Sequence, residues 1–185
     1  MRALRVTLIG PECTGKTWLA GDLADHYGVP WSKEHAREYV LSHGRALGYG
    51  DVEPIGRGQR TGEDAAIARA AAAGAALVLH DTDLVSTLVY SRHYYGDCPR
   101  WIEDEACRRL ADLYLLHHVD VAWVADGLQR EQPERREESL GRFRATLRTL
   151  GAAVAEIEGS WEERRSRAVT AIDRLLAERR RLEGR

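Results

Sequence analysis

Lysine is scarce in this chain. Lys16 and Lys33 are the only lysines among 185 residues, and arginine supplies nearly all of the remaining positive charge. A guanine-nucleotide switch normally reads its base with an Asn-Lys-x-Asp motif, and neither lysine lies in one. The formal net charge of −2 argues against a broad nucleic-acid surface, because such a surface needs a clearly basic face. We therefore expect a small-molecule partner and no nucleic acid, and a GTPase is disfavoured.

Cysteines and long apolar runs are also few. Cys13, Cys98 and Cys107 form an odd set without a Cys-x-x-Cys pair, which supports neither a disulfide framework nor a zinc site. No apolar run approaches the ~18 residues of a membrane span, and the first one, residues 6–9, stops at a glycine instead of forming a signal-peptide core. The sequence thus predicts reduced thiols, no membrane partner and a cytoplasmic location. Its length predicts a single domain over residues 1–185.

Short apolar runs alternate with helical patterns along the chain. Strands are predicted within 6–9, 29–34, 76–83, 112–118 and 152–159, and helices over 17–28, 34–44, 63–73 and from 161 onward. Glycines and prolines dominate residues 44–62, which predicts a loop there, although its length argues against a wholly irregular segment. The last helix carries an apolar stripe that includes Trp161, Ala168 and Ile172. This alternation predicts an α/β fold with a five-stranded parallel sheet flanked by helices on both faces.

A phosphate-binding motif, GxxxxGK[ST], follows the first predicted strand and precedes a predicted helix. Glycines allow the backbone to wrap an anion, the helix amino terminus directs N–H groups at it, Lys16 reaches the β- and γ-phosphate oxygens, and the Thr17 hydroxyl ligates Mg²⁺. The motif predicts a site for ATP with Mg²⁺. Its nucleotide-binding residues are Gly10, Pro11, Glu12, Cys13, Thr14, Gly15, Lys16 and Thr17.

An acidic triplet, Asp-Thr-Asp, ends the strand predicted within 76–83. A P-loop protein places the acid that orders Mg²⁺ at such a strand end, so Asp81 is predicted to bind the metal together with Thr17. Asp83 has two interpretations that the sequence does not separate, a functional carboxylate or a cap for the next helix.

A small-molecule kinase fits these motifs, because a motor ATPase needs further elements for which 185 residues leave little room. Such an enzyme must orient an acceptor hydroxyl towards the γ-phosphoryl group and place a carboxylate beside that hydroxyl. Glu34, Arg37 and Glu38 have the spacing of one helix face. We predict that Glu34 is the catalytic base or hydroxyl-orienting group and that Arg37 lies beside it. The alternative is a solvated salt bridge between the two.

A polar, arginine-rich segment, residues 126–142, follows the strand predicted within 112–118. Its composition is typical of a lid that closes over ATP and excludes water, and the alternative is a charged helix surface. We predict that Arg130 contacts the transferring phosphoryl group and that Arg136 also binds the nucleotide.

Four segments in this order, GPECTGKT, EHAREYV, HDTD followed by STLVYSRHYYG, and WVADGLQR, resemble the ribosylnicotinamide kinase domain of NadR-type proteins. The resemblance spans about residues 5–159. It implies a P-loop kinase-like fold and ATP-dependent phosphorylation of the ribosyl 5′-hydroxyl of nicotinamide riboside, which gives nicotinamide mononucleotide for NAD salvage. Some family members carry further amino-terminal domains, and the first strand predicted here begins so early that we expect the kinase domain alone.

The acceptor that this resemblance implies has a cationic nicotinamide ring, which aromatic faces bind well. Among the rings of Trp31, Tyr90, Tyr94, Tyr95 and Trp123, we select Trp31 and Tyr94 for the pocket. Gln59 is predicted either to bind the carboxamide or to be a surface amide, and Asp83 is a candidate to bind the ribose hydroxyls. His80, His117 and His118 are interpreted as structural. Two alternatives stay open, a kinase for another nucleoside or small metabolite and a non-catalytic nucleotide-binding regulator. The oligomeric state stays open as well.

Overall fold

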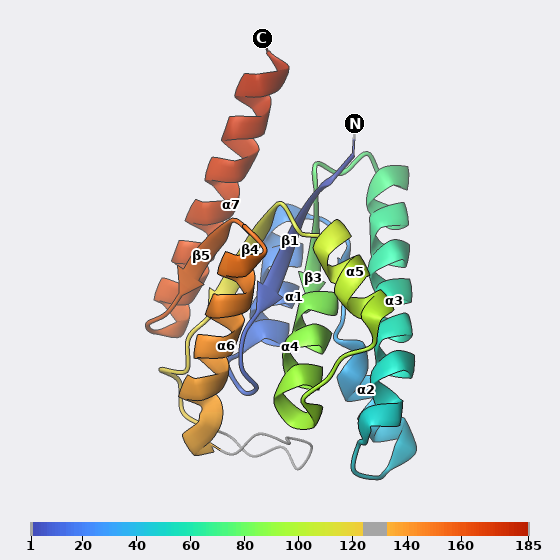
Figure 1. The fold of residues 1–185 in the computed structure, drawn as a ribbon. Coiled ribbons are helices and arrows are strands. Elements are labelled where there is room, and N and C mark those ends of the chain that lie inside the picture. Colours follow the sequence, from blue (N-terminus) through green and yellow to red (C-terminus); the bar gives the residue numbers. More distant parts are fainter. Residues whose placement is uncertain (1, 124–132, 185) are drawn as a thin grey trace.

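Five parallel strands form the central sheet, in the order β2-β3-β1-β4-β5 (Figure 1). The computed structural model describes residues 2–123 and 133–184. Each strand overlaps a segment predicted from the sequence, so the parallel five-stranded sheet is confirmed. The strands are β1 (Leu4–Ile9), β2 (Trp31–Ser32), β3 (Leu77–Asp81), β4 (Leu113–His117) and β5 (Val154–Ile157).

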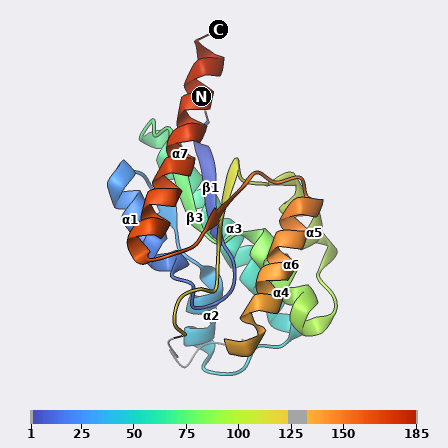
Figure 2. The same ribbon diagram turned by 90° about the vertical axis from the view of Figure 1, so that its left-hand side faces the viewer.

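Helices cover both faces of this sheet (Figures 1 and 2). Helices α3 to α6 pack on one face, α1 and α7 pack on the other, and α2 lies near the carboxyl ends of the strands. The helices are α1 (Lys16–Tyr27), α2 (His35–His43), α3 (Val52–Ala72), α4 (Leu84–Tyr95), α5 (Arg100–Arg108), α6 (Arg136–Thr149) and α7 (Trp161–Glu183), and 3₁₀ turns cover Tyr49–Asp51 and Pro133–Arg135. None of the helices in the described ranges is both long and apolar enough to cross a membrane.

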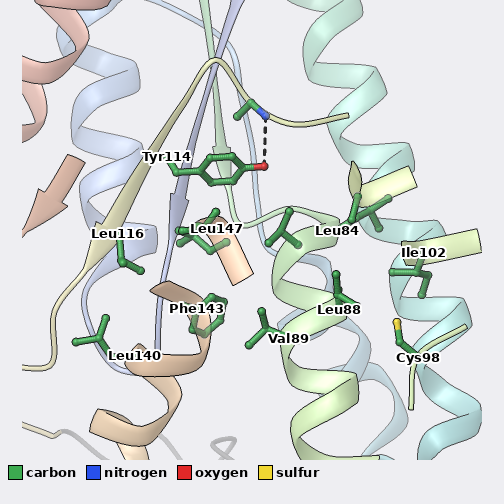
Figure 3. Close-up of a cluster of buried hydrophobic side chains, with 14 of the residues drawn as sticks. Leu84, Leu88, Val89, Cys98, Ile102, Tyr114, Leu116, Leu140, Phe143 and Leu147 are labelled. Atoms are coloured by element: carbon green, nitrogen blue, oxygen red, sulfur yellow. Dashed lines mark hydrogen bonds between the residues drawn. The ribbon is translucent and has the colours of Figure 1, made fainter. Parts of the chain in front are cut away.

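The two cores follow from the alternation of side chains along the central strands, which are apolar on both faces. On the face of α4 to α6, the sheet residues Ile9, Tyr114 and Leu116 pack against helix residues such as Leu88 and Phe143 (Figure 3). The Tyr114 hydroxyl accepts a hydrogen bond from the Ala111 amide (3.3 Å). On the opposite face the sheet packs against α1 and α7, through Leu8, Leu79, Leu115, Leu19, Leu23, Ala168 and Ile172.

The loop predicted over residues 44–62 is helical from Val52 onward, because α3 begins there. Two of the glycines in this segment mark places where other side chains approach the helix closely. A Cβ on Gly56 would lie 2.9 Å from Ile102 of α5, and a Cβ on Gly58 would collide with the His35 ring of α2. Close packing against two neighbours therefore outweighs the low helix propensity of glycine here.

The carboxyl-terminal part of the predicted lid is also helical. Residues 136–142 are the first turns of α6, in which Ser139 and Leu140 are buried against the core. Residues 136–142 of the predicted lid therefore belong to the start of α6, and the extent of a lid stays a prediction. Residues 126–132, with Arg130, lie outside the described residues.

Candidate functional site

The phosphate-binding loop connects β1 to α1, as predicted. Its glycines are required by geometry, because Gly10 and Gly15 have φ angles of 135° and 80°. A Cβ on Gly10 would lie 2.7 Å from the His117 carbonyl oxygen, and one on Gly15 would collide with the Trp161 ring. Cys13 also adopts a positive φ of 54°, which is uncommon outside glycine. The loop is therefore held tightly between β4 and the start of α7.

Lys16, Thr17 and Asp81 meet at the carboxyl end of the central strands. The Lys16 ammonium donates to the Pro11 carbonyl (2.6 Å), so its side chain folds back over the loop. The Thr17 hydroxyl donates to Oδ2 of Asp81, also at 2.6 Å. Burial raises the pKa of Asp81, while the Thr17 hydrogen bond and the Lys16 charge oppose that shift.

The oxygens of Thr17 and Asp81 fit the chemistry of Mg²⁺. The metal prefers hard oxygen ligands and commonly uses one or two protein groups together with phosphates and water. Oδ1 of Asp81 is buried without a hydrogen-bond partner in the described structure, which leaves an acceptor at this position. In the described ranges, no group of three or more His, Cys, Asp or Glu side chains forms a self-sufficient metal cluster. The residues thus suit a metal that arrives with a nucleotide.

Glu34 lies beside this cluster, immediately before α2. Its backbone is extended (φ −64°, ψ 118°), so Glu34 occupies the N-cap position of α2 and is not itself helical. The prediction that Glu34 shares a helix face with Arg37 and Glu38 is therefore wrong for Glu34. Burial and the neighbouring Asp81 charge together raise the pKa of Glu34 to about 7, against the opposing effect of the Lys16 charge. A carboxyl group in this position can exchange a proton near neutral pH.

A cavity of about 430 Å³ extends from the phosphate-binding loop to α2 and α4. Its lining includes Glu34, Arg37 and Tyr90, and the half-exposed rings of Trp18 and Trp161. A recess of about 40 Å³ continues from it, and four residues line both spaces: Glu34, Ala36, Thr82 and Tyr90. Glu34 therefore stands where a ligand in the recess would meet a ligand on the phosphate-binding loop.

The recess is lined by aromatic, aliphatic and hydroxyl-bearing side chains from α2, α3 and α4. Tyr90 and Tyr95 supply rings, and the Tyr95 hydroxyl donates to the Leu47 carbonyl (3.2 Å). Ser86 also lines the recess, and its hydroxyl is buried without a partner in the part of the chain that the structure describes. Glu34 is the one acidic residue of this lining, and the described lining contains no lysine or arginine.

Three residues predicted for the acceptor pocket lie elsewhere. Trp31 of β2 pairs with Leu79 of β3. Its side chain packs with the core beneath α1, because strand alternation turns it away from the recess. Tyr94 stacks on Tyr90 (5.9 Å between ring centroids) and lines neither space. Asp83 is buried, where one oxygen accepts from the Val85 amide (2.9 Å) and the other from the Tyr114 hydroxyl (2.8 Å). Asp83 therefore caps α4, which was its alternative interpretation.

Gln59 does line the recess, but its polar atoms are largely engaged. Its amide nitrogen donates to the Thr82 carbonyl (3.1 Å) and to Glu63 (3.3 Å), and its oxygen accepts from the His35 amide (3.0 Å). Gln59 thereby supports the recess wall by joining α3 to the β3–α4 connection and to α2.

The histidines have the structural roles expected of them. His80 on β3 forms a hydrogen bond with Ser32 of β2 (2.8 Å), and burial lowers the pKa of His80 to about 3. His117 and His118 point to different surroundings, the first buried against the phosphate-binding loop and the second paired with Glu156 (2.5 Å). These histidines therefore brace the sheet edges and loops around the site.

Two tryptophans that the sequence alone did not assign to the site flank the phosphate-binding loop. Trp161 was placed on the apolar stripe of α7, yet it is 48% exposed, and Trp18 on α1 is 53% exposed. Their rings meet edge to face with centroids 5.5 Å apart. Large apolar side chains exposed together at a cavity mouth indicate a ligand surface. The signal in the sequence was Trp18 directly after the motif, on a helix face that the buried residues do not share.

A sheet of this strand order, with a phosphate-binding loop after β1 and an acid at the end of β3, defines a P-loop nucleotide-binding domain. The chain belongs to the AAA domain family, whose model matches residues 5–164.

Similarities to known proteins extend this assignment. The trifunctional NAD biosynthesis/regulator protein NadR of Salmonella typhimurium (strain LT2) is 30% identical over 128 residues, which are 67% of this chain and 30% of NadR. Crystal structures of NadR protein, one in complex with NR and one with NAD and AMP-PNP, have TM-scores of 0.78 and 0.75 at 24% identity. They cover 94% of this chain and 51% and 49% of those chains. Thymidylate kinase from Ehrlichia chaffeensis has a TM-score of 0.65 at 14% identity, covering 95% of this chain and 100% of that one.

These similarities confirm the P-loop kinase-like fold and the resemblance to NadR-type proteins. The chain spans less than a third of the length of the curated NadR that it matches and about half of the NadR chains of known structure.

Proposed function

We propose that this domain is an ATP-dependent kinase that phosphorylates the ribosyl 5′-hydroxyl of nicotinamide riboside to give nicotinamide mononucleotide. The observation that carries the proposal is the position of Glu34, on the shared wall between the cavity over the phosphate-binding loop and the recess. An acceptor seated against the recess would present its hydroxyl to Glu34 and to a γ-phosphoryl group on the loop. NadR, which a crystal structure describes in complex with NR, is the relative that supplies the acceptor.

The recess itself suits a group other than a phosphate. Its described lining has no cationic group to bind one, whereas Lys16 and Arg37 line the adjoining cavity. A cationic pyridinium ring instead gains from the Tyr90 and Tyr95 rings and from the Glu34 carboxylate. The recess volume of about 40 Å³ suits a few atoms, such as a carboxamide group, and the unpaired Ser86 hydroxyl is available to bind it.

The donor nucleotide is proposed to bind in the larger cavity, over the phosphate-binding loop. Its phosphates lie on the loop amides and Lys16, and its base lies against the exposed indoles of Trp161 and Trp18. Mg²⁺ held by Thr17 and Asp81 neutralises charge on the phosphate oxygens when it is bound. Glu34 orients the acceptor hydroxyl and receives its proton as the oxygen attacks the γ-phosphorus, and ADP leaves. Arg130 is proposed to contact the phosphoryl group from the segment outside the described residues.

The first test is ADP release by the purified protein with Mg-ATP and a panel of nicotinamide riboside, ribonucleosides and deoxyribonucleosides. We expect release that depends on nicotinamide riboside and that falls roughly 10²–10⁴-fold in Glu34→Gln, as loss of a proton acceptor predicts. Glu38→Gln is the matched control, because Glu38 is an exposed carboxylate on the same helix outside both spaces. ADP release that no acceptor stimulates would overturn the kinase proposal, and preference for a different nucleoside would overturn the substrate.

A further inference from the structure

Two buried arginines hold the phosphate-binding loop from behind. Arg164 of α7 is 0% exposed and Arg136 of α6 is 7% exposed. Arginine is rarely buried to this extent without several partners, because five N–H groups must then find acceptors inside the protein. The guanidinium groups are far apart in sequence but converge on neighbouring residues of one loop.

The two side chains bind consecutive carbonyl groups of that loop. Arg136 donates to the Cys13 carbonyl (3.2 Å), and Arg164 donates to the Thr14 carbonyl (3.3 Å). His117 of β4 also contacts the Thr14 carbonyl through Nδ1 (3.0 Å). Burial lowers the pKa of His117 to about 3, so this contact is made by a neutral imidazole at physiological pH.

The same arginines bind the segment that follows β4. Arg136 donates to the carbonyls of Val119 (3.2 Å) and Val121 (3.0 Å). Arg164 donates to the His118 carbonyl (3.1 Å) and pairs with Asp120. Each guanidinium thus joins the phosphate-binding loop to residues 118–121 by direct hydrogen bonds.

Arg164 adds a third segment, the connection between β5 and α7. Its Nε donates to the Gly159 carbonyl (2.9 Å), and the Gly159 amide in turn donates to Asp120 (2.6 Å). Its guanidinium also lies over the Trp161 ring, 5.7 Å from the ring centroid. The indole at the mouth of the cavity is therefore held by the same side chain that holds the Thr14 carbonyl.

A physical reason connects these contacts to nucleotide binding. A loop that turns its N–H groups inward to a phosphate must turn several carbonyls outward, and buried carbonyls need donors. Water could serve an exposed loop, but here the outward side is packed against β4, α6 and α7. Arginine supplies several donors in a fixed plane and no acceptor that would compete for the loop amides.

We propose that Arg136 and Arg164 are positioning residues that preorganise the phosphate-binding loop and the Trp161 surface for the donor nucleotide. This differs from the direct nucleotide contact predicted for Arg136, because its described hydrogen bonds all go to main-chain carbonyls and its side chain does not line the cavity. The inference rests on the loop as a nucleotide site and is independent of the acceptor proposed above.

Hydrogen exchange of the nucleotide-free protein tests the positioning directly. Arg136→Lys and Arg164→Lys keep the charge, but one ammonium cannot reach the carbonyls that a guanidinium spans. We expect amides of residues 10–17 and 118–123 to exchange about tenfold faster, as expected when a buried carbonyl loses its donor, while β3 is unchanged. Arg148→Lys on α6 and Arg174→Lys on α7 are matched controls, because both side chains are exposed.

ATP binding then separates positioning from general destabilisation. We expect each variant to weaken ATP binding about tenfold by calorimetry, and to raise the KM for ATP with little change in kcat or in the acceptor KM. Exchange that stays at the wild-type rate in residues 10–17, or that rises equally throughout the chain, would overturn the proposal. Because exchange needs neither substrate, failure of the proposed kinase function would leave this result intact and readable.

Discussion

The two halves of the candidate site are built in different ways. The half around the phosphate-binding loop is made of consecutive backbone groups, fixed by Gly10, Gly15 and the arginines behind them. The recess is made of side chains from three helices, and Ala36, Gln59 and Ser86 come from α2, α3 and α4 in turn. The first half binds a group that all nucleoside triphosphates share, and the second must distinguish one acceptor from another. Backbone geometry therefore binds the triphosphate, and side-chain packing determines which acceptor fits.

The largest expected effect comes from removing the Lys16 ammonium group from the phosphate-binding loop. Lys16→Met is expected to lower turnover about 10²–10³-fold, because a positioned charge on the transferring phosphate is lost. Lys33→Met is a matched control that the composition itself supplies, since Lys33 is the only other lysine, is exposed and lies outside both spaces. Steady-state kinetics with circular dichroism on both variants checks this. Comparable losses in the two variants would contradict the assignment.

A pair of aromatic substitutions sharpens the contrast between the halves. Tyr95→Leu should raise the acceptor KM about 2–30-fold and leave the KM for ATP unchanged, since a ring over a cation contributes about 0.5–2 kcal/mol. Trp161→Leu should do the opposite, with about a tenfold rise for ATP. Tyr95→Phe and Trp161→Phe keep a ring and serve as controls. If either leucine variant raised both KM values equally, the two halves would not be separate subsites.

The smallest expected effect concerns the support behind the recess. Glu63 is buried beneath Gln59 with Arg109 3.7 Å away, and burial raises its pKa from 4.5 to about 8, with the Asp83 charge adding to the shift. The folded state therefore binds a proton that the unfolded state has released between these values, so this group makes stability fall as pH rises through that window.

Glu63→Gln removes the titrating carboxyl group and keeps a side-chain oxygen that can accept from the Gln59 amide. We expect a higher melting temperature than wild type at pH 8 and a similar one near pH 4.5. Glu53→Gln, an exposed residue of the same helix, should follow the wild-type profile. Thermal unfolding across this pH range measures the difference, and an unchanged slope in Glu63→Gln would show that Glu63 is ionised in the fold.

The same contrast explains what the sequence could predict. The phosphate-binding loop, Thr17 with Asp81, and the five strands depend on short-range patterns, and each was found where it was expected. Glu34 was also found beside Asp81, although it precedes α2 instead of lying on it. Motifs of this kind are readable because neighbouring residues determine their geometry.

The acceptor pocket was predicted less well because its rings are chosen by tertiary packing. Strand alternation on an edge strand turns Trp31 to the opposite core, and the α2–α3 connection closes over Tyr95 instead of Tyr94. Gly56 and Gly58 favoured a loop in the sequence. In the structure they lie within α3 and allow α5 and α2 to approach it closely. Alternation is a local pattern, but which face of the sheet carries the recess and which helices approach each other depend on elements that are distant in the sequence.

The wall shared by the two spaces has a thermodynamic consequence. Glu34, Ala36, Thr82 and Tyr90 face both, and Thr82 holds a left-handed backbone conformation there, with φ at 65°. Ligands in the two spaces would contact the same four residues, so we expect each ligand to change the affinity for the other. Linkage requires the factor to be identical in both directions. If a bound donor lowers the dissociation constant of the acceptor by some factor, the bound acceptor lowers that of the donor by the same factor.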